Sequence, residues 1–523
     1  MTTGAPGAAV ESLVGATVDP PREASRARWL PAAVAGVLVV SIALRFLSRP
    51  PLWLDEAQTV EIARRSLPHL VAALRHDGAP PLYYLLLHGW MSVAGTSTFA
   101  IRALSGIFAV ASLPVMWFVA RRFRPPGSAS PWPAVLLLAT CPFAVRYATE
   151  ARMYALVLLL VLLGLFLFER AWSTGSRWAM AAAAVVTGAL LLTQYWAMFL
   201  IAVVGLGAVG CLLRGDRRGW RVVVPLAVGC LAFVPWLPTF AYQSAHTGAP
   251  WGAPPGLETP LLTLRDWSGG WLSGPLLGVA YYLLIAVALA GHPTFDGSGI
   301  TFRRPLRRPA LLLIGLAVAT LYVGVVASVV ASSAYASRYS TIVLAPALLV
   351  VAFGLAVLPG RARTVALCVV CALGLAGSAW LPAKLRTQAG QVAALLQAAG
   401  PHDLVVFCPD QLGPAVHRLA PDAGTQVVYP TFGSAAMVDW VDYEKRNKSA
   451  DPIAFARQAL QRASGRPIWL VYRTGYPTLA GACTSLVTSF TVARGRPEDE
   501  LAPHGAFEKY TVARFPAAAP PAG

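Results

Sequence analysis

Long apolar segments recur along this chain of 523 residues, and they constrain its fold more than any other feature. The runs are about 16–20 residues long, which is the length that an α-helix needs to cross a bilayer. Hydrophobic residues make up 56% of the chain and charged residues 13%, whereas soluble domains carry about 25% charged residues. The sequence therefore predicts an α-helical polytopic membrane protein with spans at residues 30–47, 101–120, 132–147, 153–168, 178–196, 197–213, 222–238, 275–291, 310–331, 340–359 and 364–381.

Arginine clusters between these runs indicate which helix ends face the cytoplasm. With residues 80–95 left out of the count, the clusters RRFR (121–124), RGDRRGWR (214–221), RRPLRR (303–308) and RAR (361–363) share one side, as the positive-inside rule requires. We therefore expect about eleven spans, a cytoplasmic N-terminus, and a juxtamembrane or re-entrant helix at residues 80–95 on the outer side. The chain carries a net charge of +18, but its arginines lie in short clusters between apolar runs, as the positive-inside rule produces, so we expect no nucleic-acid partner.

Composition divides the chain into four parts. The first part shows no cleavable signal peptide, and the second holds the spans. The third alternates strand-like runs such as DLVVF (403–407) with helical stretches, which is typical of an α/β domain. We expect a disordered cytoplasmic tail (1–29), a transmembrane domain (30–383) with outer juxtamembrane helices in 50–100, an extracytoplasmic α/β domain (384–515), and a disordered end (516–523).

Two cysteines fall in the predicted outer domain. Cys408 and Cys483 would share an oxidising compartment, where disulfides form. Their separation in space does not follow from the sequence, so the pairing stays open.

Charged residues at the outer ends of the predicted spans depart from the positive-inside pattern. Each one alone is explained by solvation at the interface, because charges cost least at span ends. Together they bring guanidinium groups, which bind phosphate, and carboxylates, which accept protons from nucleophiles, to one membrane depth. We therefore predict an outer cavity that holds a lipid-borne phosphate, built from Asp55, Glu56, Asp77, Arg102, Arg146, Glu150, Arg152 and Arg338.

Several of these residues also have a local explanation. Asp55 is a candidate N-cap of a helix that begins at DEAQTVEIARR (55–65), with Glu56 in its first turn. His76 and Asp77 precede a Pro-Pro pair and suit a surface loop. Gln194 and Tyr195 suit an interfacial aromatic belt. The sequence leaves both explanations open.

Five stretches, taken in their order along the chain, resemble the GT-C membrane glycosyltransferases of the family-39 type. This branch holds the protein O-mannosyltransferases and the bacterial enzyme that transfers aminoarabinose to lipid A. The resemblance covers residues 30–360, and it implies the GT-C fold for the transmembrane domain. The stretches are LWLDEAQT (52–59), DGAPPLYYLLLHGW (77–90), FAIRALSGIFAV (99–110), RYATEARMYAL (146–156) and ASRYSTIVLAPAL (336–348).

The resemblance implies an inverting transferase that takes a sugar from a polyprenyl-phosphate carrier at the outer face and passes it to an acceptor hydroxyl. The catalytic base of the family falls on Asp55, and Glu56 is expected to orient the acceptor or the sugar. A hydroxyl needs such a base, and positive charge stabilises the departing phosphate. Substrate-binding roles are expected for His76, Asp77, Arg102, Arg146, Glu150, Arg152, Tyr154, Gln194, Tyr195, Arg338 and Tyr339.

Two departures from the family pattern bear on the substrate. Relatives often carry a charged residue before the Pro-Pro pair, where this chain has Gly78 and Ala79, and a His or Lys where it has Gln194. Both indicate a donor or acceptor different from that of the lipid A enzyme. A composition rich in Ala, Arg and Val is typical of high-GC bacteria whose cell wall uses polyprenyl-phosphate mannose and arabinose, and we favour mannose.

We expect an acceptor in the cell envelope, either a glycan, a lipid or a protein. No cofactor is expected to be required, and metal dependence stays open, since adjacent acids can hold a divalent cation although no cage of oxygen ligands is visible. We expect the protein in the plasma membrane. Two alternatives remain: a lipid or glycan transporter or flippase, which needs mid-span ionisable groups and usually a repeat, and a non-catalytic envelope scaffold. The sequence shows few such groups and no repeat.

Overall fold

The computed structural model describes residues 23–123, 130–248, 255–256, 258–269, 273–294, 299–303, 306–330, 335–479 and 481–518. The first helix, α1, begins at Glu23, inside the segment that was predicted to be disordered. Residues 1–22 and 519–523, which complete the two predicted tails, lie outside the described residues.

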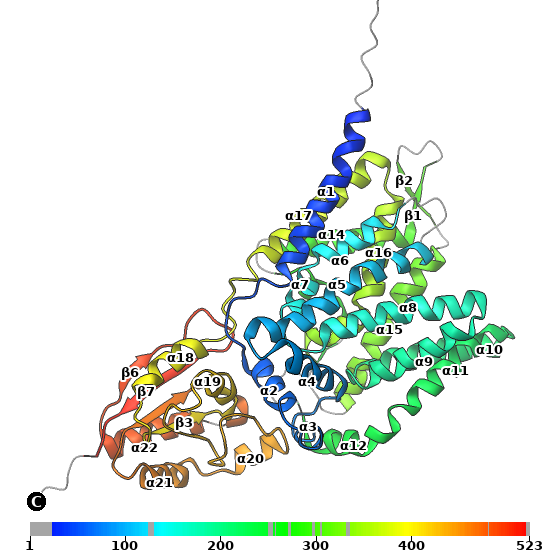
Figure 1. The fold of residues 1–523 in the computed structure, drawn as a ribbon. Helices are drawn as coiled ribbons and strands as arrows, with labels where there is room; N and C mark the ends of the chain where they lie inside the picture. The colour runs from blue at the N-terminus through cyan, green and yellow to red at the C-terminus, as the bar shows by residue number, and fades with distance from the viewer. Residues whose placement is uncertain are drawn as a thin grey trace, which may run out of the picture.

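The described part of the chain is a helical bundle with a sheet-containing domain beside it (Figure 1). Within the described residues, six helical stretches are long and apolar enough to cross a membrane, and four shorter apolar helices accompany them. The prediction of a multi-pass membrane protein is confirmed, while the number of about eleven spans stays a prediction. The helices are α1 (Glu23–Leu44), α5 (Thr98–Phe123), α6 (Trp132–Thr140), α7 (Pro142–Ala148), α8 (Tyr154–Thr174), α9 (Arg177–Leu191), α10 (Ala197–Leu213), α11 (Trp220–Leu231), α12 (Leu237–His246), α13 (Thr259–Trp267), α14 (Gly274–Ala290), α15 (Arg308–Val330), α16 (Thr341–Val357) and α17 (Gly360–Ala379).

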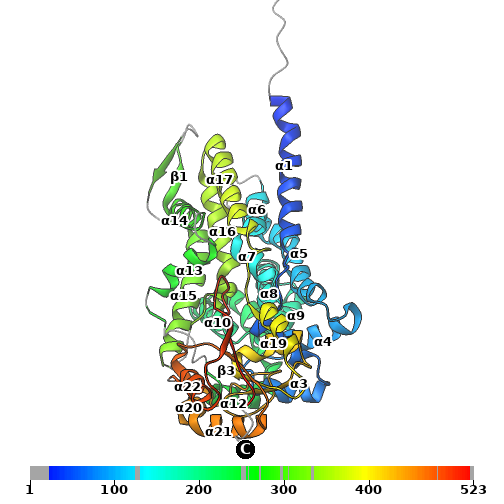
Figure 2. The ribbon, with the colours of Figure 1, turned by 90° about the vertical axis from the view of Figure 1, so that its left-hand side faces the viewer.

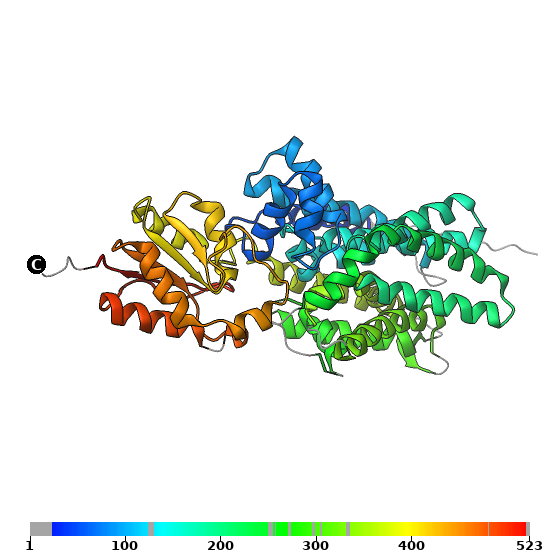
Figure 3. The ribbon, with the colours of Figure 1, turned by 90° about the horizontal axis from the view of Figure 1, so that it is seen from below.

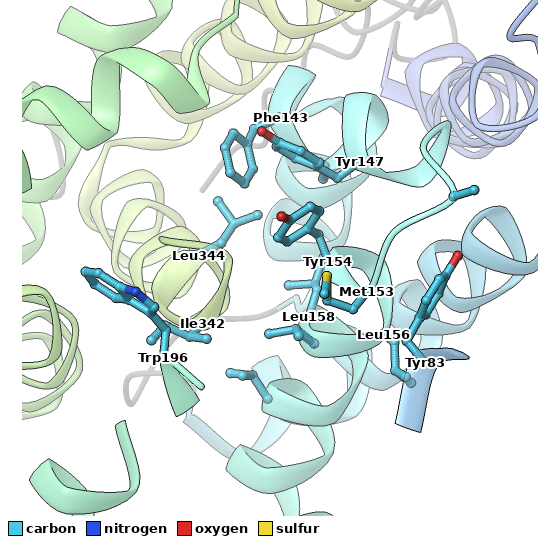
Figure 4. Packing of buried hydrophobic residues seen from close by; sticks show 14 of the residues in the cluster. Tyr83, Phe143, Tyr147, Met153, Tyr154, Leu156, Leu158, Trp196, Ile342 and Leu344 are labelled. Carbon is cyan, nitrogen blue, oxygen red and sulfur yellow. The ribbon is translucent and has the colours of Figure 1, made fainter. Parts of the chain in front are cut away.

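The centre of the bundle is α16, which packs against α14, α15, α8 and α6. Its sequence TIVLAPALLVVAFGLAV is apolar on every side and almost entirely buried, as expected for a helix that is surrounded by others. Aromatic side chains fill the space between α7, α8 and α16, where Tyr147 and Tyr154 pack edge to face with ring centroids 4.8 Å apart (Figure 4). This core fixes the helix ends from which the charged residues project.

The predicted span 132–147 is broken into α6 and α7 at Cys141. Pro142 occupies the first position of α7, and a proline inside a helix removes one backbone hydrogen bond. Arg45, at the end of α1 and 1% exposed, donates to the freed carbonyls of Leu138 (3.0 Å) and Ala139 (2.9 Å). A buried arginine thus satisfies the backbone groups that the break exposes.

Three short helices connect α1 to α5, and the first of them packs against the sheet-containing domain. They are α2 (Leu54–Ala63), α3 (Leu67–Leu74) and α4 (Leu82–Ala94). The 13 residues of α4 extend about 20 Å at 1.5 Å per residue, which is too short to cross a hydrocarbon core of about 30 Å. The structure thus agrees with a juxtamembrane helix at residues 80–95.

The sheet-containing domain is an α/β domain, as predicted. Its five strands have the order β4-β3-β5-β7-β6, in which β3 pairs in parallel with β4 and β5, and β7 pairs antiparallel with β5 and β6. Figure 3 shows this domain at one end of the molecule. The elements are α18 (Ala389–Leu395), β3 (Leu404–Cys408), α19 (Gly413–Leu419), β4 (Thr425–Val428), α20 (Tyr443–Ser449), α21 (Pro452–Ala463), β5 (Ile468–Tyr472), α22 (Ala482–Arg494), β6 (Glu498–Leu501) and β7 (Thr511–Phe515).

Alternating side chains of β3 face two separate cores. Leu404 and Val406 pack with α21 and α22, whereas Val405 and Phe407 pack with α18, α19 and the membrane part. The period of two along a strand produces this division. Cys408 and Cys483 are joined by a disulfide that links β3 to α22, so the pairing that the sequence left open is present.

The two ends of the bundle differ in what they carry. Figures 1 and 2 show the hairpin of β1 (Gly291–Pro293) and β2 (Ile300–Phe302) at the same end as the start of α1, and the α/β domain at the opposite end. The α/β domain contacts α2 through α19, and it reaches the residues before α4 and at the end of α12 through backbone hydrogen bonds.

Candidate active site

One cavity gathers most of the charged and aromatic residues that the sequence singled out. It has a volume of about 280 Å³ and lies between α2, the segment before α4, the turn before α8, and the 3₁₀ helix η3 (Ser337–Ser340). Of the predicted site residues it is lined by Asp55, Asp77, Arg152, Tyr154, Gln194, Tyr195, Arg338 and Tyr339.

Asp55 and Arg338 form an ion pair in this cavity. Asp55 lies in the first turn of α2, and Nη1 of Arg338 donates to its Oδ2 at 2.7 Å. The two side chains are 17% and 16% exposed, respectively, so both reach the cavity. The predicted N-cap role of Asp55 is wrong, because Trp53 occupies the cap and Asp55 makes no capping bond. Helix capping therefore does not explain why an aspartate occupies position 55.

A second set of charged residues, Arg152 and Asp77, also lines this cavity. Nη1 of Arg152 donates to the hydroxyls of Thr59 (2.8 Å) and Tyr84 (3.1 Å). The Tyr84 hydroxyl donates to Asp77 at 2.5 Å, and Gln58 donates to the other Asp77 oxygen at 2.6 Å. Burial raises the pKa of Tyr84 well above its ordinary value, so the phenol stays protonated and keeps donating.

Glu56 lies beneath the cavity and does not line it. Its carboxylate is fully buried and accepts from Arg102 Nε (2.7 Å) and Nη2 (2.5 Å), from the N–H of Ala151 (2.9 Å), and from the N–H of Trp53 (3.4 Å). Burial raises the pKa of Glu56, but Arg102, Arg386 and the N–H of Ala151 together outweigh it, and the net shift is downward. Glu56 and Arg102 thus tie α2 to α5 and to the turn before α8.

Arg386 is a buried residue of this layer that the sequence did not single out. It follows α17 and donates to the carbonyl (2.9 Å) and hydroxyl (2.6 Å) oxygens of Thr149. Its guanidinium lies 4.0 Å from Glu56 and 3.8 Å from Glu150. Burial raises the pKa of Glu150, with Arg386 and Arg146 acting in the opposite direction. Nothing in the sequence marks Arg386, because an arginine after a span resembles any interfacial charge.

The structure places Arg146 and His76 outside the cavity. Arg146 lines a second cavity of about 260 Å³ with Arg265, Asp266 and Lys384. His76 is half-exposed and pairs with Asp439 of the α/β domain at 2.9 Å. The predicted set therefore divides between the first cavity, the layer beneath it, and these two positions.

Aromatic and amide groups complete the first cavity. Tyr339 stacks on Trp196, with ring centroids 5.6 Å apart. Tyr195 donates to Gln243 and accepts from the Trp236 indole N–H at 2.9 Å. The amide atoms of Gln194 are buried and have no hydrogen-bond partner among the described residues, so this side chain can bind a polar ligand group.

Gly78 is required by the geometry of the cavity wall. Its φ is +80°, and a Cβ at this position would lie 2.8 Å from the hydroxyl oxygen of Thr247. A larger residue would therefore be strained and would displace Thr247, which also lines the cavity. This accounts for the absence of a side chain at Gly78.

The described residues contain no group of three or more His, Cys, Asp and Glu side chains that could hold a metal ion. Independence from metals stays a prediction.

Residues 78–242 match the sequence model of the family described as dolichyl-phosphate-mannose-protein mannosyltransferase. A comparison with curated proteins found no match.

Solved structures share the fold over nearly the whole chain. ArnT from Cupriavidus metallidurans in the apo state has a TM-score of 0.62 and 15% identity, covering 95% of this chain and 100% of that chain. The same protein bound to undecaprenyl phosphate has a TM-score of 0.54 and 14% identity, covering 94% and 99%. The predicted resemblance is confirmed: the chain has the fold of the GT-C membrane glycosyltransferases, and residues 78–242 match the mannosyltransferase branch.

Proposed function

We propose that this protein is an inverting glycosyltransferase that uses a polyprenyl-phosphate sugar. The observation that carries the proposal is the pairing of the Asp55 carboxylate with Arg338 in a cavity that Arg152 also lines. A base and two guanidiniums beside one another match the needs of transfer from a lipid phosphate. The fold match to ArnT bound to undecaprenyl phosphate supports a lipid-phosphate carrier.

The reaction follows from these positions. Asp55 removes the proton from the acceptor hydroxyl as its oxygen attacks the anomeric carbon of the sugar. The bond from that carbon to the phosphate oxygen breaks, and the electron pair leaves with the polyprenyl phosphate. Arg338 and Arg152 stabilise the charge that develops on the phosphate. Attack from the face opposite the leaving group inverts the anomeric carbon.

The layer beneath the cavity positions these groups. Glu56 binds Arg102 and the N–H of Ala151, and Ala151 directly precedes Arg152. We therefore propose that Glu56 is a positioning residue: it fixes α2, which carries Asp55, against the turn that carries Arg152, and it does not itself contact the substrate.

We propose mannose as the donor sugar, with arabinose as the alternative. The match to a dolichyl-phosphate-mannose family over residues 78–242 supports mannose. Gln194 lines the cavity and its amide has no hydrogen-bond partner among the described residues, so it is our candidate for a bond to a sugar hydroxyl. The acceptor belongs to the cell envelope.

We propose that the cavity opens on the outer side of the plasma membrane. Arg303 follows the hairpin at the α1 end of the bundle, and the α/β domain lies at the opposite end. Arginine-rich ends face the cytoplasm. The Cys408–Cys483 disulfide of the α/β domain suits an oxidising outer compartment.

The test is a transfer assay with defined donors. Membranes that contain the protein are given radiolabelled synthetic polyprenyl-phosphate mannose or polyprenyl-phosphate arabinose, and label in the glycan and protein fractions is measured. The proposal predicts label from the mannose donor, with the opposite anomeric configuration in the product. Label from neither donor, with the protein folded and abundant, would contradict it. Mass spectrometry of lipid-linked sugars in a deletion strain, where the donor should accumulate, identifies the natural sugar.

A further inference from the structure

We propose that the α/β domain completes the substrate cavity, and that Trp440 is a specificity-determining residue that binds a saccharide acceptor. This inference rests on the proposed function, because it assigns the acceptor class of the same site. Among the described residues of the α/β domain, Trp440 is the one that lines the first cavity. Its position follows from the contacts of its own segment, residues 438–442.

The segment 438–442 binds three separate walls of the cavity. The N–H of Val438 donates to Gln58 of α2 at 3.0 Å, and Gln58 donates back to the Val438 carbonyl at 3.3 Å. The N–H of Trp440 donates to the carbonyl of His76 at 2.9 Å. Gln58, which also holds Asp77, lines the cavity itself. Residues 438–442 therefore join the first two walls, which are α2 and the stretch before α4.

The third wall follows α12. The N–H of Asp442 donates to the His246 carbonyl at 2.8 Å, and Val441 pairs with Thr247 as an antiparallel bridge. Thr247 lines the cavity. Because these contacts use the backbone, they fix the path of the segment independently of most of its side chains. The cavity wall at this point thus depends on the α/β domain.

Helix α20 of the α/β domain also contacts residues 438–442. Arg446 of α20 donates to the carbonyls of Asp439 (2.5 Å) and Val441 (2.9 Å), which flank Trp440. The Trp440 ring packs on Tyr443, with centroids 4.9 Å apart. Trp440 is 9% exposed, so its orientation is set before any ligand arrives. A pre-organised ring loses little entropy on binding.

The side chains around Trp440 in the first cavity suit a sugar ring. Sugar rings present C–H groups on one face, which pack on aromatic rings by dispersion, and hydroxyls around the edge. Beside Trp440 the cavity offers Asp77, Gln58 and the Thr247 hydroxyl as polar partners. Leu54, the neighbour of Asp55, packs against the Trp440 cluster. A ring held by Trp440 would therefore lie on the Asp55 side, where the acceptor hydroxyl must be.

The location of residues 438–442 indicates that Trp440 binds the acceptor rather than the donor. The donor carries a lipid tail and must enter from the bundle. Trp440 belongs to the α/β domain, which lies at the end of the molecule away from the start of α1 (Figures 1 and 2). An acceptor that approaches along this domain meets Trp440 first.

The test compares Trp440→Ala and Trp440→Phe in the full-length protein in lipid nanodiscs. The probes are octyl α-mannopyranoside as saccharide acceptor, a Ser/Thr peptide as protein acceptor, and polyprenyl phosphate for the donor side. We expect Trp440→Ala to raise the KM for the mannoside about five- to tenfold, with kcat and the affinity for polyprenyl phosphate unchanged. Trp440→Phe, which keeps an aromatic face, should stay close to wild type. Equal losses for donor and acceptor, or no change in the mannoside KM, would overturn the inference.

A direct binding measurement separates this inference from the proposed function. Octyl α-mannopyranoside binding is measured calorimetrically for the wild type, Trp440→Ala and Asp55→Asn. We expect Trp440→Ala to weaken binding and Asp55→Asn to retain it, whether or not transfer occurs. If the wild type glycosylates the peptide and does not bind the mannoside, the acceptor class proposed here is wrong, while the transferase itself stands. Unfolding temperatures of the Trp440 variants establish that they are folded.

Discussion

Arg338 and Asp55 are 283 residues apart in the chain, yet their side chains form a hydrogen bond of 2.7 Å in the main cavity. The guanidinium comes from η3 at the start of α16, and the carboxylate comes from α2. Opposite charges at this distance attract strongly when water is partly excluded. The pair is therefore the point at which two distant stretches of the sequence become one site.

Replacing Arg338 tests its role at the leaving group. We expect Arg338→Gln to lower kcat at least about 100-fold, because a charged group aimed at developing negative charge is lost. Arg338→Lys should retain part of the activity, since it keeps the charge without the planar fork. Arg64→Gln is a matched control, because Arg64 follows α2, is exposed, and pairs only with Glu61 among the contacts described. Equal activities of the Arg338→Gln variant and the control would exclude Arg338 from the chemistry.

Replacing Glu56 tests the buried layer. Glu56→Gln leaves the Arg102 guanidinium, which is 5% exposed, without its ionic partner. Breaking a buried ion pair costs about 3–5 kcal/mol of unfolding free energy. We expect the variant in detergent to unfold at a clearly lower temperature and denaturant concentration than the wild type.

Asp55→Asn serves as the comparison for this measurement. Asp55 is part-exposed in the cavity, so its replacement should change stability by much less. If the two variants were equally stable, Glu56 would have no special role in holding α2 to α5.

The stability of the protein should fall as the pH rises from about 4.3, the ordinary pKa of a glutamate, toward 7. Burial raises the pKa of Glu508 to about 7, the nearby Asp55 charge adds to this, and the Thr387 and Tyr510 hydroxyls oppose it. A folded-state pKa above the unfolded value means that the folded state binds the proton more tightly, so stability is full at low pH and is lost through this window. We expect Glu508→Gln to unfold with a smaller difference between pH 5 and pH 8 than the wild type.

Asp410 provides a check on this assignment. Burial raises its pKa to about 6, so it contributes in the same direction over a lower range. The double variant Glu508→Gln/Asp410→Asn should show a flatter pH dependence than either single variant. A slope that is unchanged in Glu508→Gln would mean that Glu508 does not titrate in this range.

Chelation tests the prediction that no metal is required. We expect transfer activity in membranes to be the same after EDTA treatment and dialysis as before. A loss that Mg²⁺ or Mn²⁺ restores would show that a divalent cation takes part, with Asp55 and Asp77 as the carboxylates available in the cavity.

Features that depend on local pattern were predictable from the sequence. The length of the apolar runs predicted the membrane helices, because a span needs a continuous apolar stretch, and strand-like runs alternating with helical stretches predicted the α/β domain. The family motifs placed Asp55, Arg152, Tyr154, Arg338 and Tyr339 in one cavity, since these residues lie at helix ends on the same side of the bundle.

Features that depend on contacts between distant segments were not predictable. Glu56 is adjacent to Asp55 in sequence, but the rotation of 100° per helical residue directs it into the layer that holds Arg102. Arg386 reaches the buried layer through its contact with Thr149, and Trp440 reaches the cavity because its segment binds Gln58 and His76. Nothing in the local sequence of either residue indicates these contacts. Arg146 resembles the other outer arginines, yet it faces the second cavity.

The most direct test of the central claim compares transfer by the wild type, Asp55→Asn and the exposed control Asp422→Asn in membranes with equal protein levels. A missing general base typically costs 10²–10⁴-fold in rate. We predict that Asp55→Asn lowers the rate of sugar transfer from the polyprenyl-phosphate donor by at least about 100-fold, while Asp422→Asn retains the wild-type rate. Transfer by Asp55→Asn at a rate close to that of the wild type would contradict the assignment of Asp55 as the base, and with it the account of the cavity as the catalytic site.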